Sequence, residues 1–118
     1  MSVTITAKFS KVDDYNNPVF SVSKSDTESY QKLVTIYNKL KRMKLDTFLP
    51  VYHDQENEYG TIRFKRAKSG TFTAGSTYEI EFAVNKREHE GKTYVSCYIQ
   101  KLDLLKAVDL GQTIDFTF

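Results

Sequence analysis

The chain has 118 residues, of which 40% are hydrophobic and 27% charged, so its size and composition fit one compact globular domain and exclude a disordered or fibrous protein. The net charge of +2 is too small to predict a polyanionic partner. No apolar run approaches the roughly 20 residues that cross a bilayer, and the single cysteine excludes an internal disulfide. The N-terminus also lacks the pattern of a signal peptide, so we expect a cytosolic protein with one domain over residues 1–118.

The first half of the chain predicts a hairpin followed by a helix. Apolar and polar residues alternate over 3–9, which is the pattern of a half-buried strand, and the turn-forming run 13–18 leads into a short second strand over 19–22. From Ser25 the apolar residues recur at helical spacing, and Ser25 with Glu28 fits a capping box. We therefore expect a helix over about 26–44, followed by an edge strand or extended connection over 48–52.

The second half predicts strands throughout. Residues 59–67 and 77–84 alternate, Ser69-Gly70 and 74–76 mark turns, and 85–92 is expected to be a charged connection. The strand expected over 93–102 places Val95, Cys97 and Ile99 on its apolar face and Tyr94, Ser96, Tyr98 and Gln100 on the other, and alternation up to the last residue predicts a C-terminal strand. Five to seven short strands and one helix predict a mainly β fold with one helix, an OB-fold-like small barrel, with a sandwich as the alternative.

Enzymatic motifs are missing from the sequence. His53 and His89 fall in predicted loops without the spacing of zinc ligands, and Cys97 is expected to be a buried structural thiol. Glu79 and Glu81 share one strand face, as solvated carboxylates commonly do. No glycine-rich phosphate loop or nucleophile elbow occurs. We expect a protein that is not an enzyme and that needs no metal or cofactor.

Basic residues interleaved with tyrosines are the remaining signal. Single-stranded nucleic acid is bound by cations that line a groove and by rings on which unpaired bases stack. The chain has eight Tyr and no Trp, and some Tyr rings are expected at the surface because their hydroxyls need water or a partner. The candidate nucleic-acid-binding residues are Arg63, Lys65, Arg66, Lys86, Arg87, Lys92, Tyr94 and Tyr98. The alternative is that these tyrosines close the core and the basic residues are ordinary surface.

Two segments in the second half carry a resemblance to a known family. Residues 75–84 (GSTYEIEFAV) and 90–102 (EGKTYVSCYIQKL), joined by a charged loop, resemble the late hairpin of phage single-stranded DNA-binding proteins. In the order of its elements and in its length the chain is similar to the single-stranded DNA-binding proteins of lactococcal tailed phages. The resemblance implies an OB-fold variant that coats single-stranded DNA during phage DNA replication and recombination, in the cytoplasm of the infected host cell.

The same resemblance implies a homo-oligomer, dimer or higher, with recombination proteins as further partners. Cellular relatives recruit partners through an acidic tail, whereas residues 113–118 hold one acid and alternate like a strand. Two alternatives remain open: a phage protein-interaction or virion structural module with a Tyr-rich binding surface, and an RNA-directed barrel of the cold-shock type.

Overall fold

The computed structural model describes residues 2–14, 17–43, 45, 49–54, 56, 59–65, 69–73, 75–106 and 113–117, and of residues 54, 69–73 and 113–117 it describes the backbone. Within these ranges the chain forms one helix and eight strands: β1 (Ser2–Val12), β2 (Pro18–Ser23), α1 (Thr27–Lys41), β3 (Val51–Asp54), β4 (Tyr59–Arg63), β5 (Ser69–Thr73), β6 (Thr77–His89), β7 (Lys92–Lys106) and β8 (Thr113–Thr117). No helix in this part of the chain combines the length and the apolar character needed to cross a membrane.

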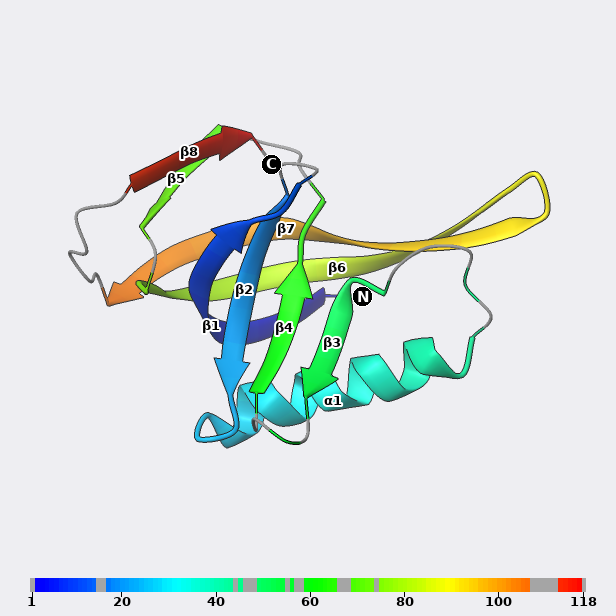
Figure 1. Ribbon diagram of the computed structural model, residues 1–118, viewed down its shortest axis with the longest axis horizontal. Coiled ribbons are helices and arrows are strands. Elements are labelled where there is room, and N and C mark those ends of the chain that lie inside the picture. Colours follow the sequence, from blue (N-terminus) through cyan, green and yellow to red (C-terminus); the bar gives the residue numbers. More distant parts are fainter. Residues whose placement is uncertain are drawn as a thin grey trace.

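The strands β3, β4, β2, β1, β6 and β7 form one antiparallel sheet in that order, and the sheet curls into a half-barrel (Figure 1). β1 is central because its first part pairs with β6 and its last part with β2, with a register shift between Phe9 and Lys11 that bends the strand. Beyond β4, the amide of Lys65 donates a 2.8 Å hydrogen bond to the carbonyl oxygen of Cys97 in β7. The predicted mainly β, OB-like small barrel with one helix is confirmed, and β5 and β8 add a separate two-stranded sheet.

Aromatic rings fill the inside of the curled sheet. The ring centroid of Phe20 lies 5.4 Å from that of Phe9, 5.6 Å from that of Phe64 and 5.9 Å from that of Tyr78, all edge to face, and Phe64 continues to Phe82 at 5.3 Å. Edge-to-face contacts of this kind stabilise a core beyond the area they bury. The alternation seen in the sequence therefore gives β1, β2, β4 and β6 one face each for this core.

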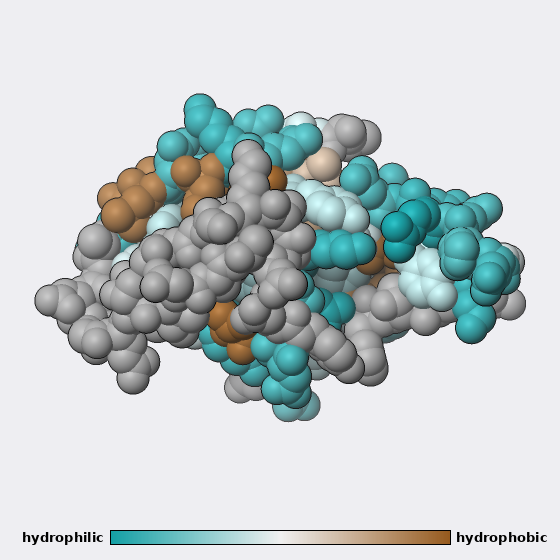
Figure 2. Space-filling view, turned by 90° about the horizontal axis from the view of Figure 1, so that it is seen from above, coloured by the Kyte–Doolittle hydropathy of each residue, from teal (hydrophilic) through white to brown (hydrophobic). Residues whose placement is uncertain are grey.

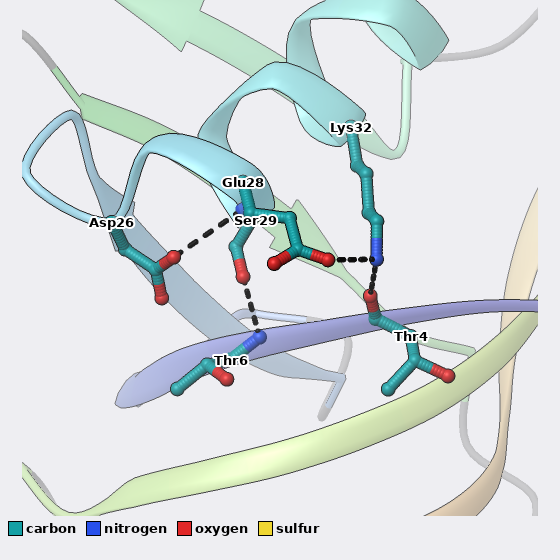
Figure 3. Close-up of polar contacts among 6 residues, drawn as sticks. All are labelled: Thr4, Thr6, Asp26, Glu28, Ser29 and Lys32. Atoms are coloured by element: carbon teal, nitrogen blue, oxygen red, sulfur yellow. Dashed lines mark hydrogen bonds and ion pairs between the residues drawn. The ribbon is translucent and has the colours of Figure 1, made fainter.

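The helix begins one residue later than the capping box predicts. Asp26 is the N-cap, and its carboxylate accepts a 3.3 Å hydrogen bond from the amide of Ser29, whereas Glu28 forms an ion pair with Lys32 at 3.4 Å (Figure 3). The capping box between Ser25 and Glu28 was thus wrong, because Asp26 satisfies the free amide of the first turn instead. The helix also ends at Lys41, earlier than expected.

Side chains of α1 complete the hydrogen bonding of β1. The hydroxyl of Ser29 accepts a 2.8 Å hydrogen bond from the amide of Thr6, and the ammonium of Lys32 donates to the carbonyl oxygen of Thr4 at 2.8 Å (Figure 3). β2 pairs with β1 only from Lys8 onward, so these backbone groups lie on an edge that β2 does not reach. The helix takes the place of a strand there and is fixed against the sheet.

Two expectations for the second half were wrong in detail. The predicted charged connection 85–92 is mostly strand, since β6 runs to His89 and β7 starts at Lys92. Only Glu90 and Gly91 turn the chain, with φ of 51° and 77°, and positive φ at both central residues suits the twist of a tight hairpin. The predicted turn at 69–70 lies within β5, because pairing with β8 continues through it.

Candidate nucleic-acid interface

The hairpin of β6 and β7 extends beyond the rest of the barrel (Figure 1) and has two different faces. Residues paired across antiparallel strands point to the same side. Val84 pairs with Cys97 on the core side, whereas Arg87 pairs with Tyr94 and Ala83 pairs with Tyr98 on the outer side. Val95, Cys97 and Ile99 are buried while Tyr94 and Tyr98 are half-buried, so the predicted assignment of the two faces of this strand is confirmed.

Lys65 lies beside the outer face of this hairpin. Its ammonium is 6.0 Å from the ring centroid of Tyr98, within the range of a cation–π contact worth about 0.5–1 kcal/mol at an exposed site. The backbone hydrogen bond from Lys65 to Cys97 fixes this neighbourhood, because Cys97 directly precedes Tyr98. A cation and an aromatic ring from distant parts of the sequence thus come together.

Further cations lie toward the tip of the hairpin. Arg87 is exposed beside Tyr94, and Lys92 pairs with His89 next to the turn. By alternation Lys92, Tyr94 and Tyr98 lie on the same side of β7. We call the set Lys65, Arg87, Lys92, Tyr94 and Tyr98 the hairpin face; Figure 2 shows that the projecting end is covered by hydrophilic side chains.

Two other candidate residues lie away from the hairpin face, and a third is not described. Lys86 lies on the opposite side of β6, where it pairs with Val95 across the hairpin and forms an ion pair with Glu88 at 3.7 Å. The guanidinium of Arg63 lies 3.8 Å from the carboxylate of Asp13, which compensates part of its charge. Arg66 lies outside the described residues.

Acidic side chains limit the hairpin face toward the barrel. Glu79 and Glu81 share the outer side of β6 with Ala83 and Arg87, and they pair with Asp103 and Lys101 respectively. Their charge would repel phosphate. The outer side of the hairpin is therefore acidic near the barrel, and Tyr98 separates this part from Arg87 and Lys92 nearer the tip. In the turn itself, the carboxylate of Glu90 lies 3.7 Å from Nε2 of His89.

The residues considered for catalysis are placed differently. Cys97 is fully buried, and burial raises the pKa of its thiol to about 12 although the charge of Arg63 acts in the opposite direction. His53 was wrongly expected in a loop: it lies in β3, where it is half-buried and shares a hydrogen bond with the hydroxyl of Tyr30. Among the described residues no group of three or more His, Cys, Asp or Glu side chains could hold a metal ion.

A second tyrosine cluster was not selected from the sequence. The side chain of Tyr52 in β3 is 53% exposed, its ring lies 6.2 Å from that of Tyr37 in α1, and the ammonium of Lys41 is 5.8 Å from the Tyr37 ring. The available signal was the polar-side position of Tyr52 beside the apolar Val51 in a predicted edge strand.

The outer surface of the sheet thus carries tyrosine rings with basic side chains beside them at two places, β7 and β3. Such surfaces can stack flat groups and attract negative charge. Comparisons of the chain with protein-family models, with curated proteins and with solved structures give no match.

Proposed function

We propose that this protein binds single-stranded DNA through the hairpin face, largely independently of sequence and without catalysing a reaction. The observation that carries the proposal is the contact between Lys65 and Tyr98, with a ring centroid 6.0 Å from the ammonium. A base stacked on Tyr98 would bring its phosphate close to a cation. Stacking on such rings contributes roughly 1–3 kcal/mol per base and tolerates every base, because each base has a flat face.

The arrangement of the hairpin supports the proposal in two further ways. Tyr94 and Tyr98 are separated by about 13 Å at roughly 3.3 Å per residue, which leaves room for successive bases along one strand. Arg87 and Lys92 are exposed on the same side, and cations in such a row neutralise phosphates irrespective of sequence. In OB folds, too, the long hairpins beside the barrel take part in oligonucleotide binding.

The biological setting in the proposal comes from the resemblance to lactococcal phage proteins. The protein would coat single strands in phage DNA replication and recombination, in the cytoplasm of the infected host cell. A domain of this size covers few nucleotides, so a homo-oligomer would extend the binding track. Recombination proteins would be its further partners.

Binding of a fluorescent oligo-dT of about 30 nucleotides, measured by anisotropy between about 50 and 200 mM salt, tests the proposal. We expect log K to fall with log salt by roughly 0.7 per phosphate neutralised, and duplex DNA of equal length to bind more weakly. An RNA strand of equal length tests for a preference between DNA and RNA. No binding of any strand at low salt would contradict the proposal and favour the protein-interaction module, since Tyr and Arg also serve protein interfaces.

A further inference from the structure

Tyr52 presents an aromatic ring to solvent on the edge strand β3. Its side chain is 53% exposed, as much as Leu104 and Leu105 at the end of β7. An aromatic ring with this much solvent-exposed surface contributes little to the hydrophobic core. It is therefore available to a ligand.

The ring of Tyr52 is held in place by side chains beneath it. The ring of Tyr37 meets it edge to face, with centroids 6.2 Å apart and planes at 78°. Tyr37 in turn packs on His53 at 6.1 Å, and His53 shares a hydrogen bond with Tyr30. A ring that is already ordered loses less conformational freedom when a flat group stacks on it.

A cation accompanies this cluster, as at the hairpin face. The ammonium of Lys41 lies 5.8 Å from the centroid of Tyr37, and that of Lys65 lies 6.0 Å from the centroid of Tyr98. Both clusters thus combine aromatic rings with a neighbouring positive charge. This is the combination that single-stranded nucleic acid requires.

The outer side of β4 connects the two clusters. Tyr52 pairs with Thr61, so both point outward, and alternation places Arg63 and Lys65 on that same side while Ile62 and Phe64 are fully buried. From Thr61 to Lys65 the strand direction covers about 13 Å, and Lys65 contacts Tyr98. The surface between Tyr98 and Tyr52 therefore carries the half-buried Thr61 and Arg63 and the exposed Lys65.

We propose that Tyr52, supported by Tyr37 and Lys41, is a second platform for an unpaired base, and that a single strand crosses the outer side of β4 between Tyr98 and Tyr52. The inference rests on the proposed function and extends its site. It enlarges the footprint of one protein molecule beyond the hairpin face. Tyr52 becomes a binding residue, whereas Tyr37 positions its ring.

The lack of tryptophan in the chain permits a direct test with three single-tryptophan variants. Tyr52→Trp and Tyr98→Trp each place the reporter at one platform, and Leu105→Trp places it at an equally exposed position on the far end of β7. On saturation with oligo-dT, stacking should quench the fluorescence at positions 52 and 98 and leave that at 105 nearly unchanged. Quenching at 98 without quenching at 52 would overturn the second platform and leave the proposed function standing.

Affinity measurements provide the second readout. Tyr52→Ala should weaken binding of a long oligo-dT by about 5- to 150-fold, which corresponds to roughly 1–3 kcal/mol per stacked base, and Tyr52→Phe should retain most of it. The loss should disappear on oligonucleotides too short to reach from the hairpin face to β3. If Tyr52→Ala unfolds, Tyr52→Leu keeps the apolar contact with Tyr37 but offers no flat ring. If a folded Tyr52→Leu variant binds oligo-dT as tightly as the control variant Leu105→Ala, the second platform is refuted. If Tyr52→Leu and Tyr98→Ala both bind as tightly as the wild-type protein, the result counts against the proposed site as a whole.

Discussion

The amide of Lys65 donates a hydrogen bond of 2.8 Å to the carbonyl oxygen of Cys97, and through it the chain beyond β4 meets β7. The same contact brings the ammonium of Lys65 to 6.0 Å from the ring of Tyr98, since Tyr98 follows Cys97. The segment after β4 is thus joined to this side of the half-barrel by the backbone contact of Lys65 and by the ring contact of Phe64 with Phe82. Lys65 and Tyr98 therefore lie beside paired strands that surround an aromatic core, and sites on such elements are more precise than sites on loops.

Lys86 and Arg87 are neighbours in the sequence that point to opposite sides of the hairpin, and they provide a matched test. Arg87→Glu and Lys86→Glu change the net charge equally, but only Arg87 belongs to the hairpin face. We expect Arg87→Glu to weaken oligo-dT binding several-fold and to reduce the salt slope by about 0.7 for each phosphate that is no longer neutralised. Lys86→Glu should have a much smaller effect at 0.15 M salt, where charges are screened over about 8 Å. Equal reductions in affinity for the two variants would mean that only overall charge matters.

Tyr98 should act through its ring and not through its hydroxyl. Tyr98→Ala should remove roughly 1–3 kcal/mol of binding free energy and Tyr98→Phe should remove little. Tyr98 is half-buried, so the alanine variant can also lower stability. Melting curves of the same samples separate that loss of stability from the loss of base stacking. Unchanged affinity together with a lower melting temperature in Tyr98→Ala would assign the ring to stability alone.

Period-two alternation predicted the strands whose one face is buried, because burial imposes that alternation. This alternation predicted β1, β2 and the residues of β7 that face the core. The outer half of the hairpin was taken for a connection since residues 85–92 are charged on both sides and bury neither. Once that segment is known to be a strand, alternation itself separates Lys86 from Arg87.

Other features depend on contacts between distant residues and could not be predicted locally. Whether Ser25 or Asp26 caps α1 is decided by how the chain leaves β2, since both residue types make good caps. The neighbourhood of Lys65 and Tyr98 requires the order of strands in the sheet, and the support of Tyr52 requires the packing of α1 on β3. Neither contact can be predicted from the sequence pattern of a single strand or helix.

Gly60 in β4 should tolerate no side chain without a loss of stability. A Cβ at this position would lie 3.1 Å from Cδ1 of Leu33 and 3.4 Å from the carbonyl oxygen of Tyr52, so the packed side chain of Leu33 would have to give way by a few tenths of an ångström. We expect Gly60→Ala to lower the free energy of unfolding by about 1–3 kcal/mol in urea titrations. The double variant with Leu33→Ala should show a smaller combined loss than the sum of the two single losses; strict additivity would mean that the two residues do not clash.

Cys97 should contribute to stability and not to binding. Its thiol is fully buried on the core side with Val95 and Ile99, so Cys97→Ser would place a hydroxyl there and lower the free energy of unfolding by roughly 1–3 kcal/mol at pH 7. Affinity of the folded variant for oligo-dT should be unchanged. Weaker binding by a fully folded variant would mean that the two sides of β7 have been interchanged.

The same thiol predicts how the stability difference between the wild-type protein and Cys97→Ser depends on pH. Burial raises the pKa of Cys97 from 9.0 to about 12, so between these values the unfolded chain has lost the proton that the folded chain still holds. The unfolded state is then favoured, and the wild-type protein loses up to about 1.4 kcal/mol per pH unit above pH 9. Lysine and tyrosine titrate in both proteins, so the difference between the two isolates the thiol. Urea titrations from pH 7 to about 10.5 should show a constant wild-type advantage below pH 9 and a shrinking one above it. An advantage that stays constant to pH 10.5 would mean that the thiol ionises as easily in the fold as in the unfolded chain, and hence that Cys97 is reached by water.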